Sequence, residues 1–497
     1  MKNYNRTSTT FLRWISVGFI FAAVLLAVFE LVQYSRIRTV YPPGLIVAGV
    51  PVGGLDQQQA AERLVQAYSI PVEMHYGDAV FQVKPAVVGF ELDVQAMLAE
   101  ADLQRVNQPF WTAFWEFLWD QIPQPDEVPL RSRLSEDRLR TFLTSEVAPR
   151  YDQKASPAVP VPGSTNFQTG KQGTILDVNR AVLLIEDALR SPTSRTVSLS
   201  FSKVNPSRPS LQTLQVLLGQ IIDLSRFEGI TEIYLLDLQT NQELHFAYQQ
   251  GKTIPADIGF SAASTIKIPI MISTFRRSPD PIPQETLDNL TKMIEFSEND
   301  PADKLMEQIN KLTGPLEVTK DIQALGLKST FLAGYFYPGA QLLQRISTPA
   351  NTRTDYFTDP DPYNQTTPAE MGQLLNDIYQ CADSGGGAFS AVFPGEILQN
   401  ECKQMINLLI LNRLPVLITA GLPEGTTIAH KHGWITEVDG LLHTISDAGI
   451  VYSPGGNYVL TAYLWNKDQL LFDPANQLVS DLSRAIYNYF NQSNVTN

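Results

Sequence analysis

Three short groups of polar residues in the second half of the chain have the types needed to act in one reaction. They are Ser-x-x-Lys at 264–267, Ser-x-Asn at 297–299 and Lys-x-Gly at 431–433. A serine hydroxyl becomes a useful nucleophile when a neighbouring base removes its proton, and a lysine three residues further along a helix lies on the same face. A second serine at 297 can pass a proton to a leaving nitrogen, and a lysine at 431 attracts an anionic substrate end. The three groups therefore predict covalent acyl transfer.

The context of Ser264 separates it from a second Ser-x-x-Lys at 200–203. An apolar run follows Ser264 over 266–272, which predicts a buried helix whose free N–H groups favour negative charge. The alternative is a serine that only caps a core helix; the two other motifs, in order, weigh against it. The copy at 200–203 ends the alternating run 196–201, which predicts a strand.

Residues 211–497 resemble the class A β-lactamase and penicillin-binding protein superfamily, whose three motifs these are. The resemblance implies an α/β (α+β) sandwich, in which helices flank an antiparallel sheet and the opening helix 212–222 packs with the closing helix 475–489. The segments that carry the resemblance are the hairpin 233–237 with 243–246, the helix starts at 297–305 and 366–371, and the strands 429–433, 447–452 and 458–463.

The same resemblance implies a role for each motif residue. Ser264 would be the nucleophile, Lys267 its base and Ser297 the proton shuttle. The backbone N–H groups of Ser264 and Trp434 would form the oxyanion hole. Substrate would be bound and oriented at Asn299, Lys431, His432, Gly433 and Trp434.

The chain departs from the family pattern in three places. The stretch between Lys267 and Ser297 is short, which predicts a trimmed cleft edge. His432 replaces the usual Thr or Ser, so its charge is expected to depend on pH near the ordinary histidine pKa of about 6.5. Class A β-lactamases activate the deacylating water with a glutamate, but residues 324–367 contain none; the carboxylates there are Asp355, Asp359 and Asp361. The chain therefore has the residues that acylation needs but lacks the glutamate that fast deacylation needs.

The N-terminus predicts a membrane anchor. Residues 14–32 are almost wholly apolar, and nineteen helical residues span about 28 Å, close to the bilayer core. We expect a cytoplasmic tail at 1–13, a single span at 14–32 and an extracytoplasmic body. A cleaved signal peptide is the alternative, although no small-x-small site follows at a suitable distance.

Residues 33–205 contain an internal repeat. Phe-Gln at 81–82 and Gly-x-x-Leu-Asp at 89–93 recur at 167–168 and 173–177, each time before an apolar helical run. The pattern resembles peptidoglycan-binding modules found beside L,D-transpeptidase and VanW-type domains. We expect two small α+β modules at 33–125 and 126–205, joined by a Pro/Ser linker to a hydrolase domain at 206–497. A pure spacer role for the modules remains open.

Composition limits the partners. The net charge of −14 argues against nucleic acid. Cys381 and Cys402 form a disulfide or remain two buried thiols. The three histidines at 430, 432 and 443 lack a zinc motif, so no metal or other cofactor is expected. Trp111, Trp115 and Trp119 make one helical face that either packs inside a module or touches the membrane.

Together these features predict a membrane-anchored extracytoplasmic serine hydrolase that forms an acyl-enzyme with β-lactams and hydrolyses them slowly. One alternative is a D-alanyl-D-alanine carboxypeptidase or transpeptidase of cell-wall metabolism. The other is a cell-wall-binding scaffold without catalysis, against which the presence of all five polar motif residues argues.

Overall fold

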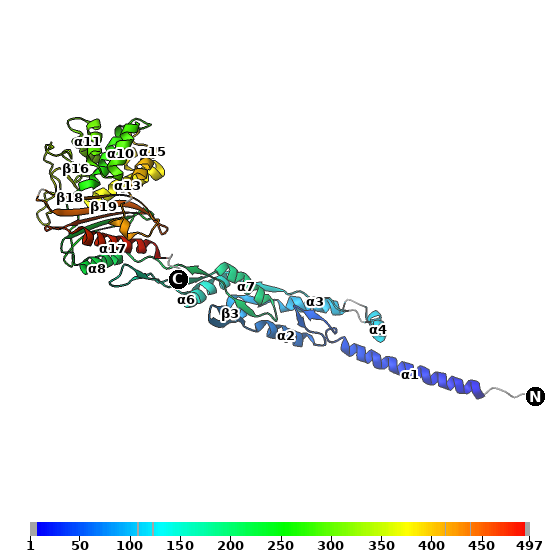
Figure 1. Cartoon of the computed structure of the whole chain (residues 1–497). Helices are drawn as coiled ribbons and strands as arrows, with labels where there is room; N and C mark the ends of the chain where they lie inside the picture. The colour runs from blue at the N-terminus through cyan, green and yellow to red at the C-terminus, as the bar shows by residue number, and fades with distance from the viewer. Residues whose placement is uncertain (1–6, 107–108, 122–123, 413, 438, 493–497) are drawn as a thin grey trace, which may run out of the picture. The chain divides into compact units, whose positions relative to one another are not determined.

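The computed structural model describes residues 7–106, 109–121, 124–412, 414–437 and 439–492. The chain forms two compact units (Figure 1). The N-terminal unit is Met1–Ala155 with Gln172–Val204, and the C-terminal unit is Ser156–Lys171 with Asn205–Asn497. Each is described by itself.

The N-terminal unit begins with the long helix α1 (Thr7–Ile37). Its segment Phe11–Ile37 contains an 18-residue window with a mean hydropathy of 2.6 and no buried residue, so its length and composition suit a membrane span. The predicted anchor at 14–32 falls inside it, and residues 1–6 of the predicted tail lie outside the described residues.

The sequence repeat corresponds to a repeated structure. The first copy is β4 (Ala79–Val83), β5 (Phe90–Leu92) and α3 (Val94–Val106), and the second is β8 (Phe167–Gln168), β9 (Gly173–Leu176) and α7 (Val178–Arg190). A capping box begins the helix Gln57–Ser69, because the Asp56 side chain accepts from the Gln59 N–H and the Gln59 side chain accepts from the Asp56 N–H. The other elements of the N-terminal unit are β1 (Ile46–Val47), β2 (Val50–Pro51), α2 (Gln57–Ser69), β3 (Val72–Tyr76), η1 (Pro85–Val88), α4 (Phe110–Leu118), β6 (Ser132–Leu134), α5 (Glu136–Phe142), η2 (Leu143–Val147), α6 (Ala148–Tyr151), β10 (Thr196–Ser198) and β11 (Phe201–Val204).

The N-terminal unit differs from the predicted pair of modules. One cluster of buried side chains runs from Tyr41 to Leu199 and draws on both ranges, and β10 of the second range pairs in parallel with β3 of the first. The hairpin of β7 (Val159–Pro160) and β8 belongs instead to the C-terminal unit. There Phe167 contacts the Tyr489 ring, with ring centres 6.2 Å apart, and Asn488 Nδ2 donates to the Thr165 carbonyl. The second Ser-x-x-Lys lies partly in the exposed strand β11, but the single strand predicted over 196–201 is divided between β10 and β11, with Ser200 between them.

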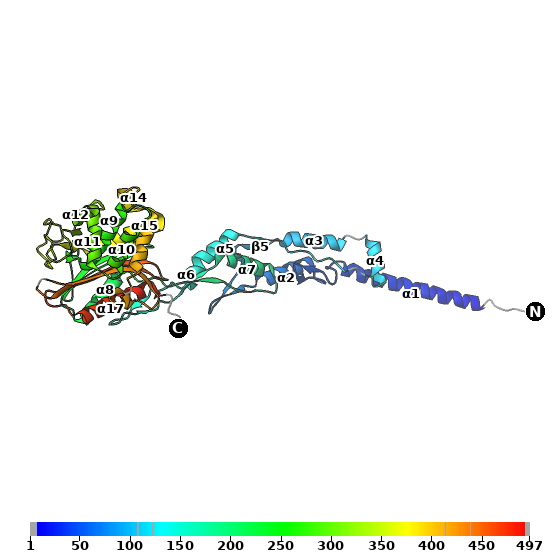
Figure 2. The ribbon, with the colours of Figure 1, turned by 45° about the horizontal axis from the view of Figure 1, so that its top comes forward.

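The C-terminal unit is built on a six-stranded antiparallel sheet of order β14-β13-β12-β20-β19-β18. Its first helix, α8 (Leu211–Ser225), and its last, α17 (Phe472–Phe490), pack together on one face over a shared apolar core (Figure 2). The strands are β12 (Ile230–Asp237), β13 (Glu243–Gln249), β14 (Lys252–Ile254), β18 (Thr427–Thr436), β19 (Leu442–Tyr452) and β20 (Tyr458–Trp465). The predicted antiparallel sandwich is therefore confirmed, including its opening hairpin and closing strands.

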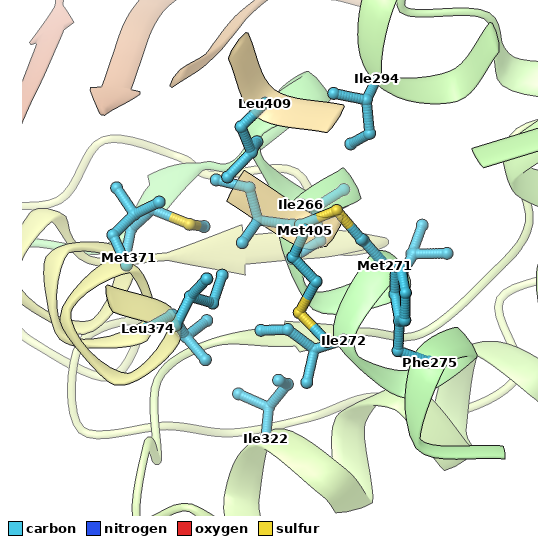
Figure 3. Close-up of a cluster of buried hydrophobic side chains, with 14 of the residues drawn as sticks. Ile266, Met271, Ile272, Phe275, Ile294, Ile322, Met371, Leu374, Met405 and Leu409 are labelled. Carbon is cyan, nitrogen blue, oxygen red and sulfur yellow. The ribbon is translucent and has the colours of Figure 1, made fainter. Parts of the chain in front are cut away.

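A second apolar core covers the opposite face of the sheet and surrounds α9 (Lys267–Arg277) (Figure 3). Met271, Ile272 and Phe275 of α9 lie there against Met371, Leu374 and Met405. The remaining elements of this unit are β15 (Phe260–Ser261), η3 (Ala263–Ile266), α10 (Gln284–Glu295), α11 (Asn299–Ile309), α12 (Gly314–Ala324), β16 (Phe331–Leu332), β17 (Asn364–Thr366), α13 (Pro368–Ser384), α14 (Ala388–Val392), α15 (Gln399–Ile410) and α16 (Ile418–Gly421). Because closely packed cores resist deformation, α9 is a fixed support for the residues at its N-terminus.

Candidate active site

Ser264 lies in the 3₁₀ turn η3, directly before α9. Every residue from Lys267 to Phe275 is buried, so the apolar run after Ser264 is a core helix, as the sequence predicts. Ala263, just before the serine, has a φ of +47°, a conformation uncommon for a residue with a side chain. The packed helix and the constrained turn together hold the Ser264 hydroxyl in one place.

Lys267 brings the first two motifs together. Its Nζ donates to Ser264 Oγ at 3.1 Å, to the Ser297 carbonyl at 2.6 Å and to Asn299 Oδ1 at 2.8 Å. These contacts point the amine at the serine hydroxyl. The geometry is that of a base beside a nucleophile.

Ser297 links the first and third motifs. Its Oγ donates to Ser264 Oγ at 2.9 Å and accepts from Lys431 Nζ, also at 2.9 Å. Its φ is +61°, which is uncommon for a serine and characteristic of residues held in place at functional sites. A hydroxyl that touches the nucleophile and a lysine can pass a proton between them and a bound substrate.

Burial changes the acidity of both lysines. Desolvation lowers the pKa of Lys267 to about 7, and the negative charges of Asp303 and Glu298 oppose this shift. Desolvation also lowers the pKa of Lys431 to about 7, and the neighbouring charge of Lys267 lowers it further. The pKa of both lysines falls because each ammonium group loses its water shell on burial and gains no full ion pair in return. Both amines therefore titrate near neutral pH.

The edge strand β18 runs beside the turn that carries Ser264. A Cβ atom on Gly433 would lie 3.0 Å from the Ser264 nitrogen and 3.0 Å from the Ala262 carbonyl oxygen. A side chain at this position would press on the backbone at Ser264, so glycine lets the strand pass this close to the nucleophile. The strand brings Trp434, the second predicted oxyanion residue, to the wall of the cavity that contains Ser264.

His432 is held as a neutral ring. Asn412 Nδ2 donates to the His430 carbonyl and to His432 Nδ1, so the proton of the His432 ring is on Nε2. Desolvation and the charge of Lys431 lower the pKa of His432 to about 3. The expectation that its charge changes near pH 6.5 is therefore wrong. The ring stacks on Trp434, with centres 4.5 Å apart, and lines the cavity.

The cavity at Ser264 has a volume of about 640 Å³. Of the three predicted water-activating carboxylates, only Asp361 lines it. Asp355 is exposed, and a salt bridge with Arg353 holds its pKa below the ordinary range. Asp359 is exposed and lines a neighbouring cavity.

Asp361 lies beside an amide at the cavity wall. It accepts hydrogen bonds from the Tyr363 N–H and from Asn364 Nδ2, and burial raises its pKa. The side-chain Oδ1 of Asn364 is buried and has no hydrogen-bond partner among the described residues. Asp361 thus presents a carboxylate, held by two hydrogen bonds, at the wall of the site.

The sequence patterns missed two supporting residues. Asp303 lies one helical turn after Asn299, accepts from the Phe336 N–H and raises the pKa of Lys267; the spacing of four residues on a helix is a signal for it. Asn412 orients His432 from another element, and nothing in its local sequence indicates this.

The remaining candidate residues have structural partners. Cys381 and Cys402 are joined by a disulfide that links α13 to α15. His430 is buried between Asp447 and the Asn412 carbonyl oxygen. Within the described residues, no group of three His, Cys, Asp or Glu side chains is arranged to hold a metal ion.

Residues 279–490 match the model of the β-lactamase enzyme family. Among solved structures, PBP-A is 21% identical, with 58% of this chain and 99% of that chain covered and a TM-score of 0.41. A β-lactamase from Xanthomonas campestris pv. campestris is 18% identical, with 56% and 97% covered and a TM-score of 0.39.

The TLA-1 extended-spectrum β-lactamase is 17% identical, with 56% of this chain and 98% of that chain covered and a TM-score of 0.41. No curated protein matches the sequence. The family-model match lies within the C-terminal unit, where the three motifs also meet. Residues 279–490 of this chain are therefore similar to the β-lactamase enzyme family.

Proposed function

We propose that the protein is a serine hydrolase that forms an acyl-enzyme at Ser264 with β-lactams and releases the product slowly. The observation that carries the proposal is the position of Lys267. Its amine is buried, lies 3.1 Å from Ser264 Oγ and has a pKa lowered to about 7. At neutral pH a substantial fraction of it is uncharged and able to take a proton.

Acylation follows from these contacts. Lys267 accepts the Ser264 proton while Oγ attacks the carbonyl carbon, and the backbone N–H groups of Ser264 and Trp434 stabilise the oxyanion. The carbon–nitrogen bond then breaks, and Ser297 supplies a proton to the leaving nitrogen. Lys267, 3.4 Å from Ser297 Oγ, returns to that hydroxyl the proton it took from Ser264 and becomes neutral again. Lys431, 2.9 Å from Ser297 Oγ, keeps its positive charge and attracts the anionic end of the substrate.

Deacylation requires a water molecule and a base. No glutamate occurs between residues 324 and 367, and Asp361 is the carboxylate of that stretch that lines the cavity. We assign the deacylating water to Asp361. The Asp361 carboxylate already accepts hydrogen bonds from the Tyr363 N–H and from Asn364 Nδ2. Because these bonds compete with a water molecule for the carboxylate, we expect deacylation to be slow.

The absence of that glutamate also favours a second candidate, a D-alanyl-D-alanine carboxypeptidase or transpeptidase. Such an enzyme uses the same acylation residues and gains nothing from rapid hydrolysis of a penicilloyl ester. The long apolar helix α1 supports a membrane anchor with the hydrolase outside the cytoplasm. The repeated β-β-α units remain candidates for peptidoglycan binding, with a spacer role as the alternative.

A pulse–chase experiment distinguishes the two substrate classes. Protein labelled with a fluorescent penicillin is chased with excess unlabelled penicillin, and parallel samples receive a D-alanyl-D-alanine peptide. Label that persists for hours while the peptide loses D-alanine supports the peptidase. Label that is lost within minutes, with matching penicillin consumption, supports the β-lactamase. Absence of label from the folded protein would contradict both.

A further inference from the structure

The short helix α4 presents an apolar face that no described part of the chain covers. Trp111, Trp115 and Trp119 recur every four residues and therefore share one side of the helix and its C-cap. Their exposed fractions are 69%, 63% and 64%. A helix on the surface of a soluble protein normally turns polar residues outward. Three exposed tryptophans on one face are instead typical of a helix that contacts an apolar partner.

The opposite face of α4 is occupied. The rings of Phe110, Phe114 and Phe117 surround Tyr34 of α1, with ring centres 5.4, 5.4 and 5.2 Å from it. Tyr34 is buried as a result. The helix is thus apolar on two sides. Packing against Tyr34 explains the phenylalanine side and leaves the tryptophan side unexplained.

The contact with Tyr34 places α4 at one position along the axis of α1, near its C-terminal end. Tyr34 lies two residues after Val32, where the apolar run ends, and Arg36 and Arg38 come next. Arg38 lies over the Phe110 ring at 5.2 Å. Figure 2 shows α4 beside the C-terminal end of α1. If α1 spans a bilayer, α4 lies where the hydrocarbon ends and the headgroups begin.

Tryptophan side chains prefer that level, because the ring is largely apolar and its N–H needs a polar partner. We propose that α4 is an interfacial helix, which seats its tryptophan face in the outer headgroup region of the membrane that α1 crosses. The occupant of the exposed face is the lipid bilayer. With α1, the helix gives the N-terminal unit a second attachment to the membrane. The inference rests on the proposed anchor and is independent of the chemistry at Ser264.

Depth-dependent quenching tests the proposal on the full-length protein in vesicles of phosphatidylcholine and phosphatidylglycerol. The chain has six tryptophans. Replacing Trp14, Trp434 and Trp465 by phenylalanine leaves those of α4 as reporters. We expect strong quenching by lipids spin-labelled at acyl carbon 5, weaker quenching by lipids labelled at carbon 12, and protection from aqueous iodide.

Two matched variants distinguish failure of the membrane anchor from failure of the interfacial helix. One retains only Trp14, which reports insertion of α1, and the other retains only Trp465 in the C-terminal unit. Quenching of Trp14 by lipid together with iodide quenching of the α4 tryptophans would leave the anchor standing and overturn the interfacial helix. Absence of lipid quenching from both would overturn the anchor and this inference together. Penicillin labelling of the wild-type protein reports the proposed function separately.

Discussion

At the scale of single residues, the site is organised by the burial of two lysines around one pair of hydroxyls. Lys267 and Lys431 both contact Ser297, and each is almost completely removed from water. An ammonium group in such a position favours its neutral form, which is the form that a base requires. The same burial is costly for folding, so activity and stability are opposed at these positions.

The acidity of Lys267 predicts how acylation depends on pH. Its pKa is lowered to about 7 and the neutral amine is the active form, so the acylation rate should rise with pH below neutrality and level off above. Asp303 raises this pKa, so Asp303→Asn should lower it and shift the rise to more acidic pH. Stopped-flow acylation with a chromogenic β-lactam measures the shift. Asp300→Asn, an exposed change on the same helix, should leave the profile in place; an unshifted profile for Asp303→Asn would remove Lys267 as the base.

His432 should act as a neutral donor at all physiological pH values. Its Nδ1 is occupied by Asn412 and its pKa is lowered to about 3, so Nε2–H is the available group. Loss of one hydrogen bond to a charged substrate costs about 1.5–3 kcal/mol. His432→Leu should therefore slow acylation by about ten- to a hundredfold, equally at pH 5 and pH 8, whereas His432→Gln should retain most of the rate. A loss confined to acidic pH would mean that the charged ring is the active form.

Asp361 should control release of the acyl group and not its formation. We expect Asp361→Asn to lengthen the lifetime of the penicilloyl adduct by about tenfold or more, because proton removal by a positioned group contributes about 10²–10⁴-fold. Intact-mass time courses measure the lifetime, and the exposed Asp359→Asn is the matched control. If both variants deacylate at the wild-type rate, water is activated elsewhere.

At the scale of elements, the nucleophile is placed by α9 and the edge strand β18. The sequence predicted both of these elements, but it did not predict the loop that completes the cavity. The apolar run after Ser264 and the alternating strands of the sheet carry strong periodic signals, and the structure contains them. The loop from Ala333 to Pro362 carries no such period. Its contribution to the cavity, including Tyr335 and Asp361, depends on contacts between distant segments.

The link between α13 and α15 supports the core behind α9. Cys381 and Cys402 close a loop with a sequence separation of 21 residues, and a loop of this size contributes about 3 kcal/mol. The double change Cys381→Ser with Cys402→Ser should lower the free energy of unfolding by about 2–4 kcal/mol in urea titrations. Wild-type protein under reducing conditions should match the variant. Equal stability of oxidised and reduced wild type would show that the bond contributes nothing.

At the scale of the whole molecule, the hydrolase motifs and the membrane-compatible helix lie in separate units of one chain. The family resemblance of residues 211–497, carried by the three motifs and by the segments between them, implied the fold of the C-terminal unit. The division of residues 33–205 could not be predicted. The repeated β-β-α pattern indicates two units, but whether their apolar faces form one core or two depends on long-range packing, such as the pairing of β10 with β3.

The central claim is that Ser264 is the acylated residue. Intact-mass spectrometry of the full-length protein with penicillin, followed by peptide mapping, tests it directly. The matched pair of variants is Ser264→Ala and Ser200→Ala, since both serines stand in a Ser-x-x-Lys sequence. We expect a penicilloyl adduct on wild type and Ser200→Ala, mapped to Ser264, and none on Ser264→Ala. An adduct that persists in folded Ser264→Ala, or none on wild type, would contradict this account.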